Sequence, residues 1–436
     1  MLRALAAGLA TLLLAVASGC DSGDDGAAQQ PAEDPATRPA QEPRLQPATL
    51  SGHLRALQRI ADENGGNRAA GTDGDRASVA YVIERLRGAG WNVRTQDVSF
   101  PFYRLRSAEL TVDGRELRRG EDFRPIVYSG SGHVAGRARG VDNGCERSDF
   151  SGLGEGEIAL AQRGDCFFRV KARNAQRAGA GAVLVADNEG GEPPAATLGG
   201  VGTRIPALIV SADAGVAAGD RVELAVDGTS ERRQTQNVIA ETPGGSGDRV
   251  VMAGAHLDSV ANGPGLNDNG SGVATLLEAA EQIGPRPPGA RIRLAFWGAE
   301  ELGLIGSRRY VRSLDERERR RIAAYLNFDM VGSPNGRPAV YSDGNRELSQ
   351  VLRRAAGRRL PGASTGGASD HAPFQSAGIP VSGLYTGASE DGRGGEPSDP
   401  CYHRSCDRFR NVNRAELAEM AAAAEKALRQ LSAQAK

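Results

Sequence analysis

Histidine and carboxylate side chains occur in four segments that lie far apart in the sequence. They are His256 and Asp258 with Asp268, then Glu300 and Glu301, then Asp329, and finally His403. Imidazole nitrogen together with carboxylate oxygen suits zinc, whereas carboxylates alone would suit magnesium or calcium better. A catalytic zinc ion takes about three protein ligands. Because the chain offers more ligands than one ion uses, we expect two ions that share a bridging carboxylate.

Each segment also has an ordinary structural explanation when it is taken alone. A single histidine after a strand, such as His256, is usually structural, and a Glu-Glu pair before a helix is usually a solvated helix start. Asp329 alone could cap a turn, and His403 alone could be a surface loop residue. Burying carboxylates at the ends of strands, however, costs desolvation free energy unless the carboxylates are paired or bind a cation. The four segments together therefore favour a shared metal site.

The elements expected around these residues are strands and helices in alternation. Residues 249–254 are apolar and largely β-branched, which predicts a buried strand, and residues 271–283 predict the helix that follows the His256–Asp268 loop. Ligands placed between a strand and a helix lie at the carboxyl end of the strand, where open α/β sheets bind their ligands. Further strands are expected at 292–297, 323–328 and 381–385, and further helices at 304–312, 346–356 and 414–431. The pattern predicts an α/β fold with three layers, in which a mostly parallel or mixed central sheet has helices on both faces.

The first half of the chain predicts two helices, a strand and then a β-rich insert. Apolar spacing predicts a helix around Leu54 to Ala61, and a second helix that is capped by Asp73 or Asp75 and stops at Gly88. A strand is expected after Trp91. Residues 107–235 contain strand-like runs at 108–112, 157–161, 182–186 and 205–210 and one helix at 168–178, but no cluster of acidic and histidine residues. We therefore assign 48–106 and 236–436 to a catalytic domain and 107–235 to an insert.

Length and charge limit the classes of partner. A chain of 436 residues predicts two or three domains. The 53 basic and 54 acidic side chains leave a net charge of −1, which gives no electrostatic reason to expect a nucleic acid partner. We expect a monomer.

The N-terminus predicts export. Residues 1–20 have a basic start and an apolar run that is too short for a membrane span. They end in Ala17-Ser-Gly-Cys20, which resembles a bacterial lipobox with Ala17 in place of the usual larger apolar residue. We expect a lipid on Cys20 that anchors the protein at the cell envelope and provides its only membrane contact. The alternative is ordinary signal cleavage, which would give a secreted or periplasmic protein. Residues 21–47 have the composition of a disordered tether.

Four other cysteines make two pairs. Because exported chains meet oxidising conditions, disulfides are reasonable. The favoured pairing joins Cys145 to Cys166 and Cys401 to Cys406, and the alternative is four free thiols.

Six stretches of the sequence resemble the co-catalytic dizinc aminopeptidase family, secreted bacterial leucyl aminopeptidases in particular. They are Gly254-Ala-His256-Leu-Asp258-Ser, Gly265-Leu-Asn-Asp268-Asn-Gly-Ser-Gly, Trp297-Gly-Ala-Glu300-Glu301-Leu-Gly-Leu, Asn327-Phe-Asp329-Met-Val-Gly, Ser369-Asp370-His-Ala-Pro-Phe and Asp399-Pro-Cys-Tyr402-His403. The resemblance implies the zinc exopeptidase fold and two zinc ions; a structural calcium ion is an additional candidate. Residues 107–235 resemble the protease-associated (PA) domain, which implies a β-rich cap without chemistry of its own and a disulfide between Cys145 and Cys166.

The resemblance also implies a role for each residue of the site. Asp268 would bridge both zinc ions, with His256 and Asp329 completing one and Glu301 and His403 the other. Glu300 would be the general base, and Tyr402 would donate a hydrogen bond to the oxyanion. Asp258 would orient the His256 imidazole. A cis peptide bond is expected between Asp268 and Asn269, and a Cys401–Cys406 disulfide would clamp the loop of Tyr402 and His403.

These roles predict removal of N-terminal residues from peptides that have a free amino group. The apolar stretch Gly383-Leu-Tyr385 favours hydrophobic side chains in the substrate. Ala368 stands where close relatives would have an Arg, which removes an expected contact beyond the scissile bond. The alternatives are a dipeptidase or carboxypeptidase of the same fold, for which no basic cluster is evident, and a non-catalytic peptide-binding lipoprotein.

Overall fold

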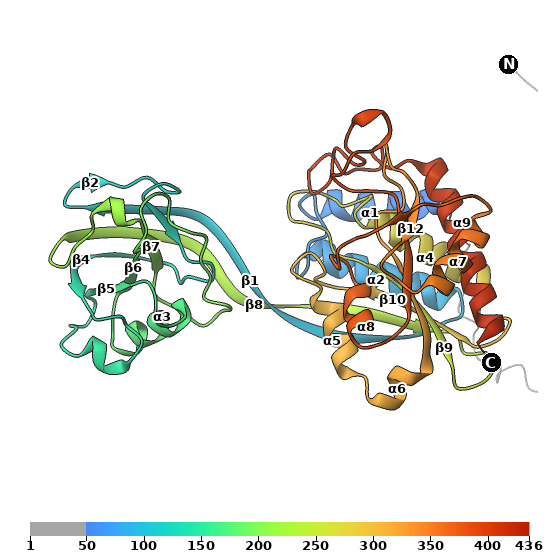
Figure 1. The fold of residues 1–436 in the computed structure, drawn as a ribbon, viewed down its shortest axis with the longest axis horizontal. Helices are drawn as coiled ribbons and strands as arrows, with labels where there is room; N and C mark the ends of the chain where they lie inside the picture. Colours follow the sequence, from blue (N-terminus) through green and yellow to red (C-terminus); the bar gives the residue numbers. More distant parts are fainter. Residues whose placement is uncertain (1–48, 436) are drawn as a thin grey trace, which may run out of the picture. The chain divides into compact units, whose positions relative to one another are not determined.

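The computed structural model describes residues 49–435, and its central feature is a mixed β-sheet (Figure 1). Part of the sheet has the strand order β13–β12–β14–β11–β9–β10–β8. The bounds are β8 Arg221–Glu241, β9 Val250–His256, β10 Arg291–Trp297, β11 Ile322–Phe328, β12 Ala339–Tyr341, β13 Gly362–Ala363 and β14 Val381–Tyr385. Strands β14, β11, β9 and β10 are parallel, whereas β12 and β8 run antiparallel to β14 and β10. The predicted α/β fold with a mostly parallel or mixed sheet is confirmed.

Helices cover both faces of this part of the sheet. Val251 and Ala253 of β9 pack in one apolar cluster and Met252 packs in another, because successive side chains of a strand point to opposite faces. The first cluster is completed by α1 Leu50–Glu63, α2 Asp73–Gly88, α4 Gly270–Ile283, α7 Arg346–Ala356 and α9 Arg414–Gln434. The second is completed by α5 Ile305–Ser313 and α8 His371–Ser376, and the short α6 Glu316–Arg321 precedes β11. The three layers expected from the sequence are therefore present.

The start of α2 differs from the prediction. Its N-cap is Thr72, whose hydroxyl accepts a hydrogen bond from the Asp75 N–H, and neither Asp73 nor Asp75 is the cap. Asp75 is buried, and its carboxylate accepts from the Gly71 N–H at 2.8 Å. Both acids lie in the first turn, where they complement the positive end of the helix dipole.

Two long strands lead into and out of the insert. β1 Asn92–Val112 pairs antiparallel with β8 along nearly its whole length, with one register shift between Leu105 and Ser107. The expected boundaries at 106/107 and 235/236 fall inside these strands, and the strand expected at 108–112 is the end of β1. The first boundary coincides with this register shift, beyond which the pairing resumes, and the pairing is uninterrupted at the second.

The segment between these strands continues the sheet, because its strand β4 Gly132–Gly140 pairs antiparallel with β8, and it packs around two further apolar clusters. β4, β5 Ile158–Gln162, β6 Ala182–Ala186 and β7 Ala207–Val210 are parallel neighbours, and β3 Phe123–Pro125 is antiparallel to β7. The short β2 Arg115–Glu116 pairs with β1, and α3 Phe168–Arg177 packs beside β6. His133 is exposed and lies 3.0 Å from Glu223, so it behaves as a solvated residue.

Both expected disulfides are formed. They join Cys145 to Cys166 and Cys401 to Cys406. Cys20, the leader 1–20 and the expected tether 21–47 lie outside the described residues. Within residues 49–435, none of the helices has the length and apolar character needed to cross a membrane.

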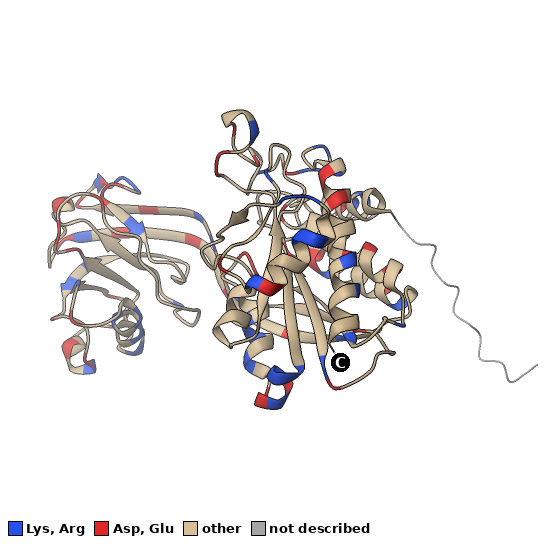
Figure 2. Cartoon of the chain, turned by 45° about the vertical axis from the view of Figure 1, so that its right-hand side comes forward, with Lys and Arg blue, Asp and Glu red and all other residues tan. Residues whose placement is uncertain are grey.

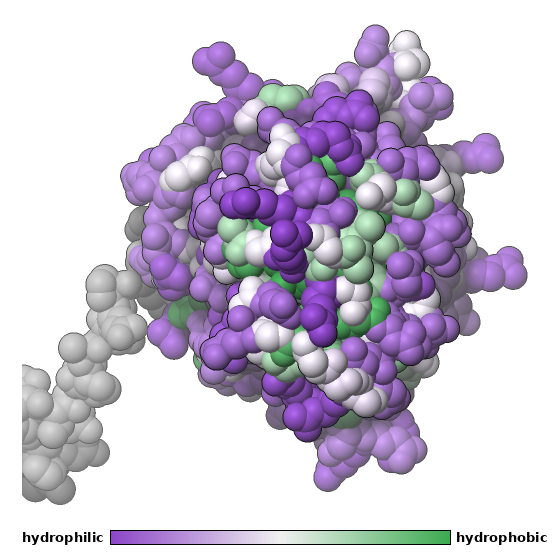
Figure 3. Space-filling view, turned by 90° about the vertical axis from the view of Figure 1, so that its left-hand side faces the viewer, coloured by the Kyte–Doolittle hydropathy of each residue, from purple (hydrophilic) through white to green (hydrophobic). Residues whose placement is uncertain are grey.

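The surface carries both signs of charge. Basic and acidic residues are interspersed along the chain in Figure 2, in keeping with the near-zero net charge. On the face drawn in Figure 3, hydrophilic side chains dominate and apolar ones gather toward the middle.

Candidate metal centre and active site

The predicted ligands meet at one edge of the sheet. His256 is the last residue of β9, Glu300 and Glu301 follow β10, and Asp329 follows β11. These strands are parallel neighbours, so their carboxyl ends lie side by side. Asp268 comes from the loop between β9 and α4, and the loop between β14 and α9 contributes His403.

Asp268 lies between the two histidines. Its Oδ1 is 3.1 Å from Nε2 of His256, and its Oδ2 is 3.2 Å from Nε2 of His403. Asp329 lies 3.3 Å from His256 on one side, and Glu301 lies 3.0 Å from His403 on the other. Tetrahedral bonds of about 2.0 Å place neighbouring ligand atoms roughly 3.3 Å apart. Two groups that could each hold a metal ion share this carboxylate, His256 with Asp268 and Asp329, and Asp268 with Glu301 and His403; a third group joins His256 to Glu300 and Glu301.

The polar atoms of this cluster fit bound cations. Oε1 of Glu301 and Oδ1 of Asp329 are buried and make no hydrogen bond within residues 49–435. Burial alone would lower the pKa of His256, but the carboxylates of Glu300 and Asp329 raise it well above its usual value. Hydrogen bonds to Asp268 and Glu301 raise the pKa of His403 to about 10. A site with this excess of negative charge is suited to divalent cations.

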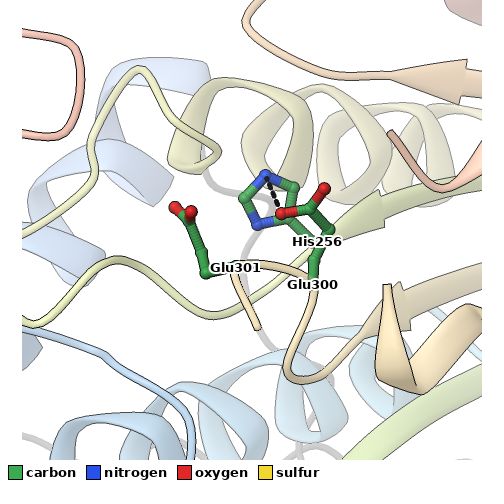
Figure 4. A group of neighbouring side chains, drawn as sticks. All are labelled: His256, Glu300 and Glu301. Carbon is green, nitrogen blue, oxygen red and sulfur yellow. Dashed lines mark ion pairs between the residues drawn. The ribbon is translucent and has the colours of Figure 1, made fainter. Parts of the chain in front are cut away.

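Glu300 approaches the cluster from the β10 side without being one of the five ligands in these two groups. Its Oε2 lies 3.9 Å from Nε2 of His256, and Figure 4 shows this pair with Glu301 beside it. Only 9% of Glu300 is exposed, and burial raises the pKa of its carboxyl well above the usual range. Glu300 is therefore placed to exchange a proton with a group bound among the ligands.

The metal cluster opens into a cavity of about 400 Å³. Leu304, Met330, Tyr341 and Tyr385 give the cavity an apolar and aromatic part. The ring of Tyr402 also lines it and stacks on His403, with the ring centres 3.9 Å apart. The remaining lining residues are Gly303, Arg308, Thr365, Gly367, Ala368, Ser369 and Ala388.

Comparison with known proteins assigns the chain to a family. Residues 237–428 match the model of peptidase family M28, and residues 125–218 match that of the PA domain. An aminopeptidase of Pseudomonas aeruginosa is 38% identical over 83% of this chain and 76% of its own length. The probable lipoprotein aminopeptidase LpqL of Mycobacterium tuberculosis is 37% identical over 84% of this chain and 81% of its own.

The chain belongs to peptidase family M28.

Solved structures agree with this assignment. The aminopeptidase of Aneurinibacillus sp. strain AM-1 superimposes with a TM-score of 0.63 and 28% identity, over 87% of this chain and 93% of that one. BSAP, a zinc aminopeptidase from Bacillus subtilis, gives a TM-score of 0.59 and 28% identity, over 89% and 96%. The protein is thus a peptide hydrolase, and both predicted resemblances, to the aminopeptidase family and to the PA domain, are confirmed.

In this M28 peptidase Asp258 supports the ligands differently from the sequence-based expectation. Its carboxylate accepts hydrogen bonds from the N–H groups of Glu300 and Glu301, at 3.0 and 3.4 Å. The imidazole Nδ1 of His256 instead lies 3.1 Å from the backbone carbonyl of Asp258 and 3.9 Å from its carboxylate. Asp258 therefore contacts His256 through its main chain and fixes the Glu-Glu segment through its side chain.

Two acids hold the loop of His403 against the loop of Asp268. The carboxylate of Asp407 accepts from the N–H groups of Asn267 and Asp268, at 2.8 and 3.0 Å. Asp399 accepts from the Asn267 amide at 2.7 Å and from the Cys401 N–H at 2.8 Å. Together with the Cys401–Cys406 disulfide, these bonds set the position of His403 relative to Asp268. Asp399 stands in the last sequence motif and Asp407 follows His403 by four residues, but their partners are distant in sequence and this role was missed.

Arg68 was also missed. It is fully buried, and its guanidinium donates to the carbonyls of Leu257, Pro264 and Gly265. It thereby braces the loop between His256 and Asp268. A single Arg between two short helices gives no signal of this role in the sequence.

The peptide bond between Asp268 and Asn269 is cis, as the resemblance implied. Ser369 donates to Asp329 at 2.5 Å.

Proposed function

We propose that this chain is an aminopeptidase that binds two zinc ions through His256, Asp268, Glu301, Asp329 and His403. The observation that carries the proposal is the placement of Asp268, whose two oxygens face one histidine each at 3.1 and 3.2 Å. Zinc is favoured over calcium because each ligand group contains an imidazole nitrogen. The similarity to BSAP, a zinc aminopeptidase, supports the same choice.

The chain's own residues divide the remaining work of peptide hydrolysis. Zinc ions held at this site would polarise the peptide carbonyl and acidify water. Glu300 takes the proton of the attacking water and delivers it to the leaving amine. The hydroxyl of Tyr402 donates a hydrogen bond to the oxygen that becomes negative. Burial raises the pKa of Tyr402, so this hydroxyl keeps its proton at neutral pH.

The acidic cluster would also hold the free amino group of the substrate, through Glu300 and a neighbouring ligand carboxylate. A cavity of about 400 Å³ lies near the lower end of ligand pockets, which span roughly 300–1,000 Å³. The cavity is therefore large enough for the terminal residue of a peptide. The apolar part formed by Leu304, Met330, Tyr341 and Tyr385 favours N-terminal Leu, Met or Phe.

A panel of small substrates tests this function. Leucine anilide should be hydrolysed, whereas N-acetyl-leucine anilide should resist cleavage because its amino group is blocked. A chelator should abolish hydrolysis, and added zinc should restore it. Efficient cleavage of the acetylated substrate would contradict an aminopeptidase, and chelator-resistant turnover would contradict the metal assignment.

A purely binding role is disfavoured by the completeness of the site. A non-catalytic peptide-binding lipoprotein would be expected to lack part of the ligand set or the base. Here the five ligands and Glu300 lie together.

We also propose the export route and the domain division. The first 20 residues and the likeness to LpqL support a lipid-anchored envelope protein, and we propose that it acts as a monomer on peptides. Residues 48–106 and 236–436 would form the peptidase domain and 107–235 the PA insert, with β1 and β8 continuous across both boundaries.

A further inference from the structure

Arg308 gives the catalytic cavity its single Lys or Arg side chain among the described lining residues. Four carboxylates line the same cavity, those of Asp268, Glu300, Glu301 and Asp329. Thr365, Gly367 and Ala368 also line the cavity and bring no charge. Besides any metal ions held there, a substrate in this cavity therefore meets one Arg side chain and a cluster of acids.

The main chain of Arg308 is held near that of Glu300. It lies in the first turn of α5, where its N–H donates to the Leu304 carbonyl at 3.0 Å. The Leu304 N–H in turn donates to the carbonyl of Glu300 at 2.8 Å. The backbone of Arg308 is thus linked to that of Glu300 by two consecutive hydrogen bonds.

The guanidinium of Arg308 is available to a ligand. Arg308 is exposed, and within residues 49–435 it forms no ion pair with a carboxylate. A guanidinium binds a carboxylate through two parallel hydrogen bonds, which makes this pair stronger and more directional than a neutral contact. It also repels the ammonium end of a peptide, so the negative end is the part of a short substrate that it attracts.

We propose that Arg308 determines specificity by pairing with a carboxylate on the leaving side of the scissile bond. This inference rests on the proposed aminopeptidase function. The carboxylate is either the C-terminus of a dipeptide or an Asp or Glu side chain in the second position. Both kinds of substrate would be preferred over neutral counterparts of the same size.

Matched substrate pairs distinguish the two sources of the carboxylate. Leu-Gly is compared with Leu-Gly amide for the C-terminal carboxylate, and Leu-Asp amide with Leu-Asn amide for the side chain. The measured quantity is the ratio of kcat/KM within each pair, so any general loss of activity in a variant cancels. Affinities for the same pairs, measured in the Glu300→Gln background, provide a readout that does not depend on turnover.

Arg308→Gln should lower the charged-to-neutral ratio about tenfold in at least one pair, because a charge-assisted hydrogen bond is lost. Arg308→Lys should keep part of the preference, since it keeps the charge without the two-pronged geometry. Arg309→Gln is the matched control, because Arg309 is the next residue of α5, is exposed and does not line the cavity.

Three results would overturn the inference. They are a charged-to-neutral kcat/KM ratio of about one in both pairs for the wild-type protein, a ratio unchanged by Arg308→Gln, and a fall in Arg309→Gln equal to that in Arg308→Gln. Failure of the wild-type protein to cleave any of the four substrates would instead overturn the aminopeptidase function on which the inference rests.

Discussion

Among single residues, Glu300 and its neighbour Glu301 have different proposed roles although they are adjacent in sequence. Glu301 belongs to a ligand group with Asp268 and His403, whereas Glu300 points at the cluster from the side. Glu300→Gln keeps the size of the side chain and removes the base. It should lower kcat by about 10²–10⁴-fold while bound zinc is unchanged. Turnover near the wild-type rate in a variant with a full metal content would contradict the assignment of the base.

Replacing Asp407 tests whether its hydrogen bonds to the Asp268 loop position the proposed metal ligands. Asp407→Asn replaces one of two accepting oxygens with an NH₂ group, which would face the N–H of Asn267 or Asp268. We expect zinc affinity to fall about 10–100-fold and the free energy of unfolding to fall by about 1–3 kcal/mol. Competition with a metal indicator dye and denaturant titration measure the two effects. Asp73→Asn, at an exposed carboxylate in α2, is the control. If both variants behave alike, Asp407 does not position the site.

The convergence of the proposed ligands could be predicted, because their residue types and local motifs indicate metal-site chemistry from sequence alone. Asp407 and Arg68 could not be assigned their roles, because hydrogen bonds between residues about 140 to 200 positions apart leave no local pattern. Asp258 was expected to orient His256, and it does contact His256. The sequence did not show that this contact is made by the backbone carbonyl of Asp258 and not by its carboxylate. That detail depends on the turn after β9, which the sequence alone does not specify.

Among elements, the contact between α1 and α2 contains a buried titratable group. His53 is fully buried, and its Nδ1 lies 2.7 Å from the hydroxyl of Tyr81. Burial, with a smaller effect of Arg85, lowers the pKa of His53 to about 3, against about 6.5 in an unfolded chain. Below pH 6.5 the unfolded chain takes up a proton that the folded protein does not, so the free energy of unfolding falls as the pH falls toward 3.

The variant His53→Gln should therefore be less sensitive to acid. Between pH 7.5 and pH 5 the wild-type protein should lose about 2 kcal/mol more unfolding free energy than the variant. Denaturant titrations of both proteins at the two pH values measure this difference, and any effect of the metal on stability cancels in the comparison. Parallel losses in the two proteins would show that His53 is not kept neutral by its surroundings.

Most elements of the peptidase part agree with the sequence-based prediction, because long buried strands and amphipathic helices have strong periodicity. The β1–β8 pair was the main failure. Each strand is 21 residues long, and its exposed and half-buried positions do not alternate regularly, so the pattern resembles two short strands with a boundary between them.

For the whole molecule, the N-terminal segment 1–20 predicts that the enzyme is anchored at the cell envelope. If Cys20 carries a lipid, Cys20→Ala should move the protein from the membrane fraction to the soluble fraction. The Glu300→Gln variant should stay with the membrane, since anchoring does not need activity. A Cys20→Ala protein that remains in the membrane fraction would contradict the anchor.

All of the chemistry proposed here depends on metal ions at the place where the β9, β10 and β11 loops converge. Diffraction data collected on both sides of the zinc absorption edge locate such ions directly. The account predicts two anomalous peaks, one among His256, Asp268 and Asp329 and the other among Asp268, Glu301 and His403. Crystals of active protein with no zinc peak at Asp268, or with zinc bound only elsewhere, would contradict it.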